Sequence, residues 1–444
     1  MGNTKNRWLI VASAVGIHIS IGSIYAYSVM TKPVASVLNL DDPTKVKTAF
    51  MIAIFCLGIS AAFLGKMVER IGPKKSGIAT AFLYGIGTIG SGIAIQVGSL
   101  NLFYFFYGVV GGFGLGIGYI TPVSTLVKWF PDKRGMATGM AIMGFGFASM
   151  VFGPLMADLF IDSIVDDKEV YTVASVTKTF YTVGVIYFLL IFGSALYMAK
   201  PPEGWLPANM QEGAKKLKTV KQDLANLDSN EALGTFRFYL IWIMMFINIS
   251  CGIALIASAS PLLQDIYKIT AVQAGAIVGL LGVFNGVGRF FWSGLSDYLG
   301  RSRTYVIFFA LQIVTFYAMP HLPSVGTFQI LFYLIMSCYG GAFAVLPAFL
   351  GDLFGTKQLG AIHGRVLTAW ACAGFAGPGL LTFLQKHFEG DYTKIFPVFV
   401  GCFVVALTAS ILMILNIKKL QSAQNSPTKP NLEPTTNKRK ESIC

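Results

Sequence analysis

Long apolar stretches recur along the whole chain, and this recurrence constrains the fold more than any other feature. A stretch of about 20 apolar residues is long enough to cross a bilayer as a helix. Only 12% of the residues are charged, against about 25% in soluble proteins, and the mean hydropathy is +0.64. The composition therefore predicts a polytopic membrane protein of the all-α class.

A window of about 19 residues separates twelve apolar segments. The first six cover residues 8–30, 46–67, 76–97, 102–126, 136–160 and 179–199. The second six cover residues 236–262, 271–295, 304–322, 327–351, 361–385 and 393–417. We therefore expect an N-terminal six-helix half (1–200), a central cytoplasmic loop (201–235), a C-terminal six-helix half (236–419) and a disordered cytoplasmic tail (420–444).

The lysines and arginines predict the orientation. With a cytoplasmic N-terminus, inner loops and tails hold 25 of the 34 basic residues, outer loops hold eight, and one lies within a span. Basic loops stay on the cytoplasmic side. We therefore expect an integral protein of the cell membrane with both termini in the cytoplasm. The net charge of +13 follows from this topology, so we expect no nucleic-acid partner.

The two halves resemble each other. Matching positions recur 224 to 228 residues apart, at Glu69 and Asp297, Phe130 and Phe354, and Pro154 and Pro378. Two parallel six-helix halves are typical of transporters whose substrate site lies between the halves, near the middle of the membrane.

The loop after the second span, "GKMVERIGPKK", combines small, acidic and basic residues at fixed spacing. The matching residues are Gly65, Glu69, Arg70, Gly72, Lys74 and Lys75. The copy after the eighth span keeps Asp297, Gly300 and Arg301, with Ser293 and Tyr298 as departures. The glycine lets two helices approach closely, and the acid can pair with a neighbouring helix end. In this loop the chain resembles the major facilitator superfamily, which implies twelve helices in two pseudo-symmetric halves and a role for the loop in conformational change.

Three further stretches carry a narrower resemblance: "NRWLIVASAVGIHISIGSIYAYSVMTKPV", "GLGIGYITPVSTLVKWFPDKRGMATG" and "NGVGRFFWSGLSDYLGR". Here the chain resembles the oxalate–formate antiporter family and its bacterial monocarboxylate-transporter relatives. The resemblance implies secondary transport of a small carboxylate, with the arginine of "NGVGR" as the residue that binds it.

That arginine is Arg289, inside the eighth span. It lies eight residues before Asp297, about 12 Å along a helix. A buried arginine suits a carboxylate because its planar fork donates two parallel hydrogen bonds. Snorkelling toward the headgroups is the alternative. Asn285, one turn earlier on the same face, is a second candidate donor.

Aromatic residues complete the expected site. Tyr119 in the fourth span offers a hydroxyl to a substrate oxygen without the cost of a charge. Simple packing is the alternative. Tyr25 in the first span and Tyr339 and Phe343 in the tenth are weaker candidates, placed by the resemblance, which implies that aromatic residues of these spans line the cavity.

Trp370 in the eleventh span bears on the substrate. Oxalate exchangers of the resembled family carry a lysine there, and this span contains none. One cation facing a dianion leaves a charge unpaired in a medium of low dielectric constant. We therefore expect a monocarboxylate such as lactate, pyruvate or formate, with an oxalate or dicarboxylate antiporter as the alternative.

His18, near the middle of the first span, is the candidate for proton coupling, since imidazole titrates near neutral pH. A histidine that only hydrogen-bonds a neighbouring helix is the alternative. The carboxylates Glu69, Asp297 and Asp352 fall at cytoplasmic ends, and His363 is placed at the cytoplasmic end of the eleventh span. The sequence leaves proton symport and anion exchange open.

Other classes of function fit less well. The loops contain no motif for a nucleotide, a metal or a catalytic triad, so we expect neither an enzyme nor a cofactor nor a metal site. A non-transporting sensor would need a larger soluble domain than the central loop and tail provide. We expect a monomer that moves a small carboxylate anion, with a proton as a further partner.

Overall fold

The computed structural model describes residues 5–42, 44–165, 168–207, 210, 224–268, 271–322 and 324–425. Within these ranges, eleven helical segments are long and apolar enough to cross a membrane. The segment predicted at 271–295 is also helical, as part of α12 (Ala271–Leu299), which packs between α7 and α14. The predicted all-α fold of twelve membrane helices is confirmed.

The N-terminal half consists of α1 (Arg7–Ile21), the 3-10 turn η1 (Gly22–Ala26), α2 (Tyr27–Val37), α3 (Thr44–Ile71), α4 (Pro73–Gln96), α5 (Leu100–Phe103), the π-helical turn η2 (Tyr104–Val110), α6 (Gly111–Trp129), α7 (Arg134–Phe160), strands β1 (Ser163–Val165) and β2 (Lys168–Val170), and α8 (Val173–Tyr197).

The short helix α10 (Ser229–Leu233) lies in the predicted central loop. The C-terminal half consists of α11 (Phe236–Tyr267), α12, α13 (Arg301–Ala318), the 3-10 turn η3 (Met319–His321), α14 (Val325–Phe354), α15 (Leu359–Val366), α16 (Thr368–His387) and α17 (Tyr392–Asn425).

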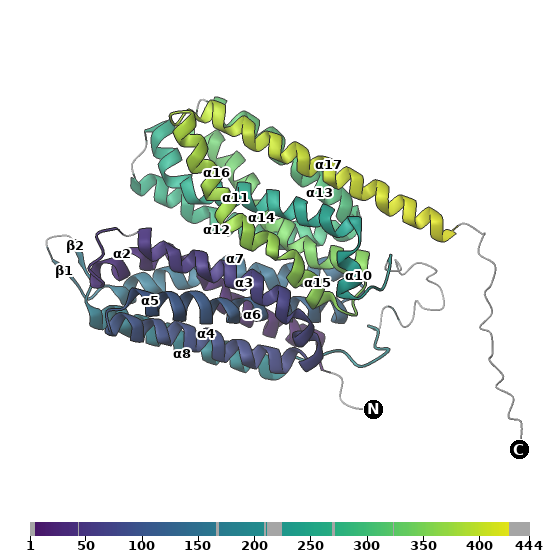
Figure 1. The fold of residues 1–444 in the computed structure, drawn as a ribbon, viewed down its shortest axis with the longest axis horizontal. Coiled ribbons are helices and arrows are strands. Elements are labelled where there is room, and N and C mark those ends of the chain that lie inside the picture. Colours follow the sequence, from purple (N-terminus) through teal and green to yellow (C-terminus); the bar gives the residue numbers. More distant parts are fainter. Residues whose placement is uncertain are drawn as a thin grey trace, which may run out of the picture.

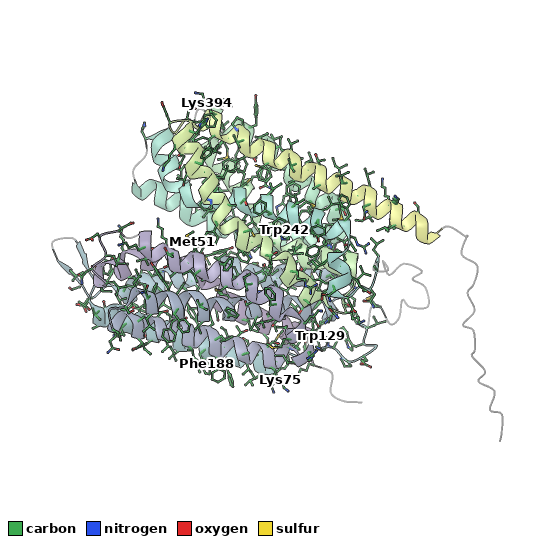
Figure 2. The ribbon with its side chains drawn as sticks, viewed as in Figure 1. Met51, Lys75, Trp129, Phe188, Trp242 and Lys394 are labelled. Carbon is green, nitrogen blue, oxygen red and sulfur yellow. The ribbon has the colours of Figure 1, made fainter. Side chains whose placement is uncertain are left out.

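The two halves lie side by side with their helices roughly parallel to one long axis (Figure 1). The chain enters α1 and leaves α17 at the same end of the molecule, which we call the termini end. The antiparallel hairpin of β1 and β2 lies at the opposite end, which we call the hairpin end. Lys75 lies toward the termini end and Lys394 toward the hairpin end (Figure 2).

Several boundaries differ from those expected. The first predicted span, 8–30, contains a break at Gly22 and continues to Val37, and the hairpin was not expected. α17 extends to Asn425, so the start of the predicted tail is helical, while residues 426–444 lie outside the described residues. Of the predicted central loop, residues 208–209 and 211–223 lie outside them too.

Two glycines start helices at equivalent points of the halves. Gly72 (φ +84°) precedes α4 and Gly300 (φ +87°) precedes α13. This left-handed conformation is strained for residues with a Cβ, and Pro73 then begins α4 at a position where a missing N–H costs nothing. Each copy of the repeated loop therefore makes the same tight turn before a helix, at Gly72 and at Gly300.

The halves meet along two seams, α3 against α15 and α16, and α7 against α12 and α14. Both seams depend on glycine. A Cβ on Gly65 would lie 2.5 Å from Cα of Ala361, and one on Gly146 would lie 2.7 Å from Cα of Gly286. The backbones are thus too close for any side chain at these points, which is how membrane helices pack without a hydrophobic driving force.

Candidate functional site

Arg289 lies completely buried between the two halves. Its Nε donates to Asn285 Oδ1 at 2.9 Å, and its Nη1 donates to the carbonyl oxygen of Ile142 in α7 at 3.3 Å. Its Cζ lies 5.5 Å from the ring centroids of both Phe145 in α7 and Phe343 in α14. A guanidinium stacked by two rings is held in one plane by cation–π attraction. Arg289 is therefore oriented by both halves and does not snorkel.

One terminal nitrogen of the guanidinium is unpaired within the described ranges. Nη2 of Arg289 has no hydrogen-bond partner among the described residues, and no carboxylate of that part of the chain pairs with the side chain. A buried charge without a partner is expensive, and this cost normally rules it out unless a ligand supplies the opposite charge. The geometry suits an anion that accepts from Nη2.

Tyr119 of α6 forms the centre of an aromatic cluster that surrounds the arginine. Its ring centroid lies 5.5 to 5.7 Å from those of four neighbours: His18, Phe145, His363 and Trp370. Trp370 also contacts Phe343, with centroids 4.8 Å apart. The cluster therefore joins α1, α6 and α7 of one half to α14, α15 and α16 of the other.

Polar atoms in this cluster share one property: within the described ranges they have no hydrogen-bond partner although they are buried. They are Arg289 Nη2, His18 Nε2, Tyr25 Oη, Tyr119 Oη, Trp370 Nε1 and both ring nitrogens of His363. Proteins satisfy nearly all buried polar groups, so several unsatisfied ones in one place indicate a site for water or a polar ligand.

The remaining predicted residues lie around the same centre. Tyr25 contacts Phe145 and Trp370, with centroids 5.0 and 6.4 Å apart. Tyr339 contacts Phe343 at 5.4 Å. The Asn285 side-chain oxygen accepts from Arg289 Nε, and its predicted role as a donor to the ligand stays a prediction. Its role in the structure is to orient the arginine.

His18 bonds its own helix. Its Nδ1 lies 3.1 Å from the carbonyl oxygen of Ala14, an acceptor that requires a proton on Nδ1. In the neutral ring Nε2 is therefore the acceptor, and this atom has no partner among the described residues.

Two members of the cluster were missed by the sequence reasoning. Phe145 stacks on Arg289 and contacts the rings of four residues, yet it looks like any other apolar residue in its span. His363 was placed at the cytoplasmic end of its span, whereas its ring lies fully buried against Tyr119. Seven residues separate it from Trp370, two helical turns on one face, which is a signal that could have found it.

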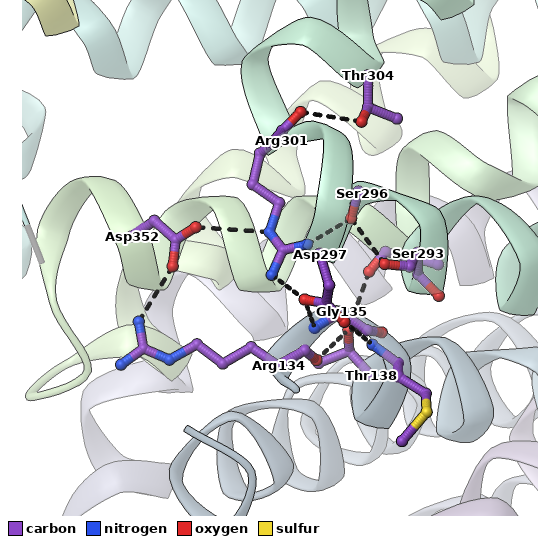
Figure 3. A network of polar contacts seen from close by, with 12 residues as sticks. Arg134, Gly135, Thr138, Ser293, Ser296, Asp297, Arg301, Thr304 and Asp352 are labelled. Carbon is purple, nitrogen blue, oxygen red and sulfur yellow. Dashed lines mark hydrogen bonds and ion pairs between the residues drawn. The ribbon is translucent and has the colours of Figure 1, made fainter. Parts of the chain in front are cut away.

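A network of charges joins the halves at the termini end (Figure 3). The Asp297 carboxylate accepts from the backbone N–H groups of Gly135 at 3.1 Å and Met136 at 2.9 Å, where α7 begins. It also pairs with Arg301, whose Nε lies 3.5 Å from Asp352. Arg134 pairs with Asp352 at 3.1 Å. An acid at a helix N-terminus is stabilised by the helix dipole.

The equivalent residue of the other half does the same with fewer partners. Glu69 Oε1 accepts from the backbone N–H of Gly360 at 3.0 Å, at the start of α15, and Oε2 pairs with Lys128 at 2.7 Å. Arg70 is exposed at the end of α3. Both copies of the loop motif therefore bind the first turn of a helix in the opposite half.

A small pocket opens beside Glu69 at the termini end, with about 220 Å³ of empty space that includes open solvent. It is lined by Val68, Glu69, Pro73, Thr121, Ser124, Thr125, Lys128 and Lys200. Within the described ranges, histidine, cysteine and acidic residues form no group of three or more with the spacing of a metal site.

Comparison with known proteins shows which family the chain belongs to. The chain is 27% identical over 393 residues to the oxalate:formate antiporter of Oxalobacter formigenes, covering 87% of each chain. It is 23% identical to monocarboxylate transporter 1 of Rattus norvegicus, covering 92% of this chain and 84% of that one.

The crystal structure of the transporter FucP in the outward conformation superposes with a TM-score of 0.66 at 14% identity, covering 91% of this chain and 98% of FucP. The model of the Major Facilitator Superfamily matches residues 13–378 and 241–442. The chain therefore belongs to the Major Facilitator Superfamily.

Proposed function

We propose that this protein is a secondary transporter of small organic anions, with a monocarboxylate such as lactate, pyruvate or formate as its substrate. The observation that carries the proposal is the buried Arg289 guanidinium, whose Nη2 has no hydrogen-bond partner among the described residues. A carboxylate would accept from Nη2 and neutralise the charge, and the Tyr119 hydroxyl would donate to the same anion. The names of the antiporter and monocarboxylate relatives support this class of substrate.

Shape and charge favour one carboxylate over two. Arg289 supplies one permanent positive charge, and Trp370 fills the space opposite with an apolar ring that is completely buried. A second carboxylate would lack a permanent cation. An oxalate or dicarboxylate antiporter is the second candidate. It is favoured by His18 and His363, two buried imidazoles that a proton would make cationic.

Transport would proceed by rocking of the two halves, residues 1–200 and 236–419, about the central cluster. The ion pairs at the termini end hold that side closed. With the excess of basic residues in the loops at this end, we propose that it faces the cytoplasm and that the protein lies in the cell membrane as a monomer. Coupling would be by proton symport or by anion exchange.

The test is uptake of labelled L-lactate and of oxalate into proteoliposomes that contain the wild type or Arg289→Lys. Lysine keeps the charge but loses the planar fork and its stacking. We expect wild-type uptake of lactate and a loss of about 100-fold in the variant, as for a buried charge-assisted pair worth about 3 kcal/mol.

Arg237→Lys is the matched control, because Arg237 is also buried and stacks on an aromatic ring, Phe354 at 5.1 Å, but lies outside the cluster. This control should transport like the wild type. Equal uptake by wild type and Arg289→Lys would refute the proposal, and uptake of oxalate alone would establish the second candidate.

A further inference from the structure

His363 is a buried basic residue of the cluster for which the proposed monocarboxylate site assigns no contact with the anion. It is completely buried in α15, and neither ring nitrogen has a partner among the described residues. The ring lies 5.7 Å from that of Tyr119, between centroids. A buried histidine normally satisfies at least one ring nitrogen, as His18 does with the carbonyl of Ala14. Two unsatisfied nitrogens leave the ring free to accept a proton on one side and release one on the other.

The position of His363 links the cluster to the termini end. One helical turn before it, the N–H of Gly360 donates to Glu69, which lines the pocket at that end. The hydroxyl-bearing residues Thr121 and Ser124 line the same pocket from α6, the helix that carries Tyr119. A Cβ on Gly360 would lie 3.5 Å from Ser124 Oγ. The polar lining of the pocket therefore reaches the first turn of the helix that carries His363.

On its other side, His363 faces the transport site through Tyr119. The Tyr119 ring also contacts His18, with centroids 5.5 Å apart, so the tyrosine lies between two imidazoles. Tyr119 Oη and His18 Nε2 lack partners within the described ranges. A tyrosine hydroxyl both donates and accepts, which suits it to pass a proton between two histidines.

Other ionisable groups surround α15 at its termini side, and several are already paired. Glu69 pairs with Lys128, and Asp352 pairs with Arg134 and Arg301. Charged and titratable groups lie near this end both on α15 and on the helices packed against it. They are Lys66, Glu69 and Arg70 of α3, Tyr119 and Lys128 of α6, Glu231 of α10, Arg237 of α11, Asp352 of α14 and Arg365 of α15. His18 of α1 lies beyond Tyr119.

We propose that His363 is the residue through which the central site exchanges a proton with the termini side, so that the transported anion moves together with a proton. The proposal rests on the proposed function and decides its coupling in favour of proton symport. The proton binds one ring nitrogen of neutral His363 to give the imidazolium, and the proton on the other nitrogen then leaves toward the pocket beside Glu69.

The charges balance over the cycle. The empty site buries the single positive charge of Arg289. A carboxylate and a proton together add no net charge, so the loaded site buries the same charge as the empty one. The empty and the loaded site therefore carry the same charge through the two reorientation steps, so the membrane potential neither drives nor opposes the full cycle. Loading with the anion alone would change the buried charge by one unit.

The experiment compares two modes of lactate transport in proteoliposomes, for wild type and His363→Gln. Glutamine resembles histidine in size and polarity but does not titrate. In the first mode an imposed inward proton gradient drives net uptake, and in the second labelled lactate exchanges with unlabelled lactate at equal pH. We expect at least a 10-fold loss of gradient-driven uptake in His363→Gln, with exchange within about twofold of the wild type.

The retained exchange shows that the variant is folded and binds the anion. His387→Gln is the matched control, because His387 is an exposed histidine at the end of α16 and should change neither mode. If His363→Gln also lost exchange, His363→Asn would repeat the comparison, and loss of both modes in both variants would overturn the proposal. Gradient-driven uptake that survives in His363→Gln would overturn it as well.

The proposal and the proposed function fail in different ways. A wild type that exchanges lactate but ignores the proton gradient refutes the role of His363 and leaves an anion exchanger. A wild type that moves no carboxylate in either mode refutes the proposed function itself.

Discussion

The network at the termini end and the central cluster are both buried, polar and shared between the halves, but they differ in how their polar groups are satisfied. Asp297 accepts from two backbone N–H groups and pairs with Arg301, and Asp352 pairs with two arginines. In the central cluster, Arg289 and Tyr119 keep polar atoms without a partner in the described part of the chain.

The two regions therefore differ in role: the network stabilises the contact between the halves, and the cluster binds the proposed ligand. A network whose acids are all paired stabilises one arrangement of the halves. An incompletely satisfied one lowers stability and is retained where a ligand completes it. Substitutions at the termini end should therefore change which way the protein faces, and substitutions in the cluster should change what it binds.

The largest expected effect comes from Asp297→Asn, which removes the charge that caps α7 and pairs with Arg301. Breaking such a pair should weaken closure of the termini end by about 2 kcal/mol, or ~30-fold in the population of the open state. The measurement is the rate of maleimide labelling at Ser293→Cys, a buried seam position beside Gly135, in a background without the native cysteines. The rate should rise by about that factor.

Glu69→Gln compares the contacts of Glu69 with those of Asp297 in the other half. Glu69 has one backbone donor and one lysine where Asp297 has two donors and an arginine. Labelling at Ala361→Cys, on the other seam, should rise by only about threefold to tenfold, and lactate affinity should stay unchanged in both variants. Equal effects of the two substitutions would show that the seams do not differ in strength.

An intermediate effect is expected for Tyr119→Phe. Its hydroxyl has no partner in the described ranges, so the free energy of unfolding should not fall, while lactate affinity should drop by about 10-fold with the loss of a hydrogen bond to a charged ligand. Tyr305→Phe is the contrasting variant, because its buried hydroxyl donates to the carbonyl of Ala342 at 2.7 Å. It should lose about 1 kcal/mol of stability and keep its lactate affinity.

Chemical denaturation in detergent gives the stabilities, and equilibrium binding of labelled lactate gives the affinities. If Tyr119→Phe destabilised the protein as much as Tyr305→Phe, the Tyr119 hydroxyl would have a structural partner and the contrast between the two regions would disappear.

The smallest effect is expected for Trp370→Phe, which shortens the apolar wall of the cluster. The extra space should shift preference toward a monocarboxylate one methylene longer than lactate, by about 1 kcal/mol or roughly fivefold. Competition of 2-hydroxybutyrate against labelled lactate measures the shift. Unchanged relative affinities would show that Trp370 does not limit the size of the ligand.

Much of this architecture follows from the sequence because the bilayer is a demanding solvent. Spans such as 136–160 are recognisable because a helix in lipid must be apolar over its length, and the result closely matches α7. The repeat that relates Glu69 to Asp297 placed both acids at equivalent seams. Arg289 was identified because a charge inside an apolar span needs a reason.

The misses come from contacts between residues far apart in the chain. His363 looked like an end residue because the apolar pattern of its span begins nearby, and only the packing of α15 against α3 and α6 reveals its burial. Phe145 is indistinguishable from a lipid-facing phenylalanine until Arg289 is placed beside it. The hydrogen bond from Arg289 to Asn285 depends on side-chain conformation, which the sequence does not encode visibly.

The partners of Asp297 and Glu69 at the seams are peptide N–H groups of Gly135, Met136 and Gly360. Every residue except proline supplies such a group, so Met136 can vary and still donate to Asp297. Gly135 cannot, because a Cβ there would collide with the backbone carbonyl oxygen of Ser293. Evolutionary change at this contact is therefore limited on both sides, by the acid that accepts and by the close packing of the helix that donates.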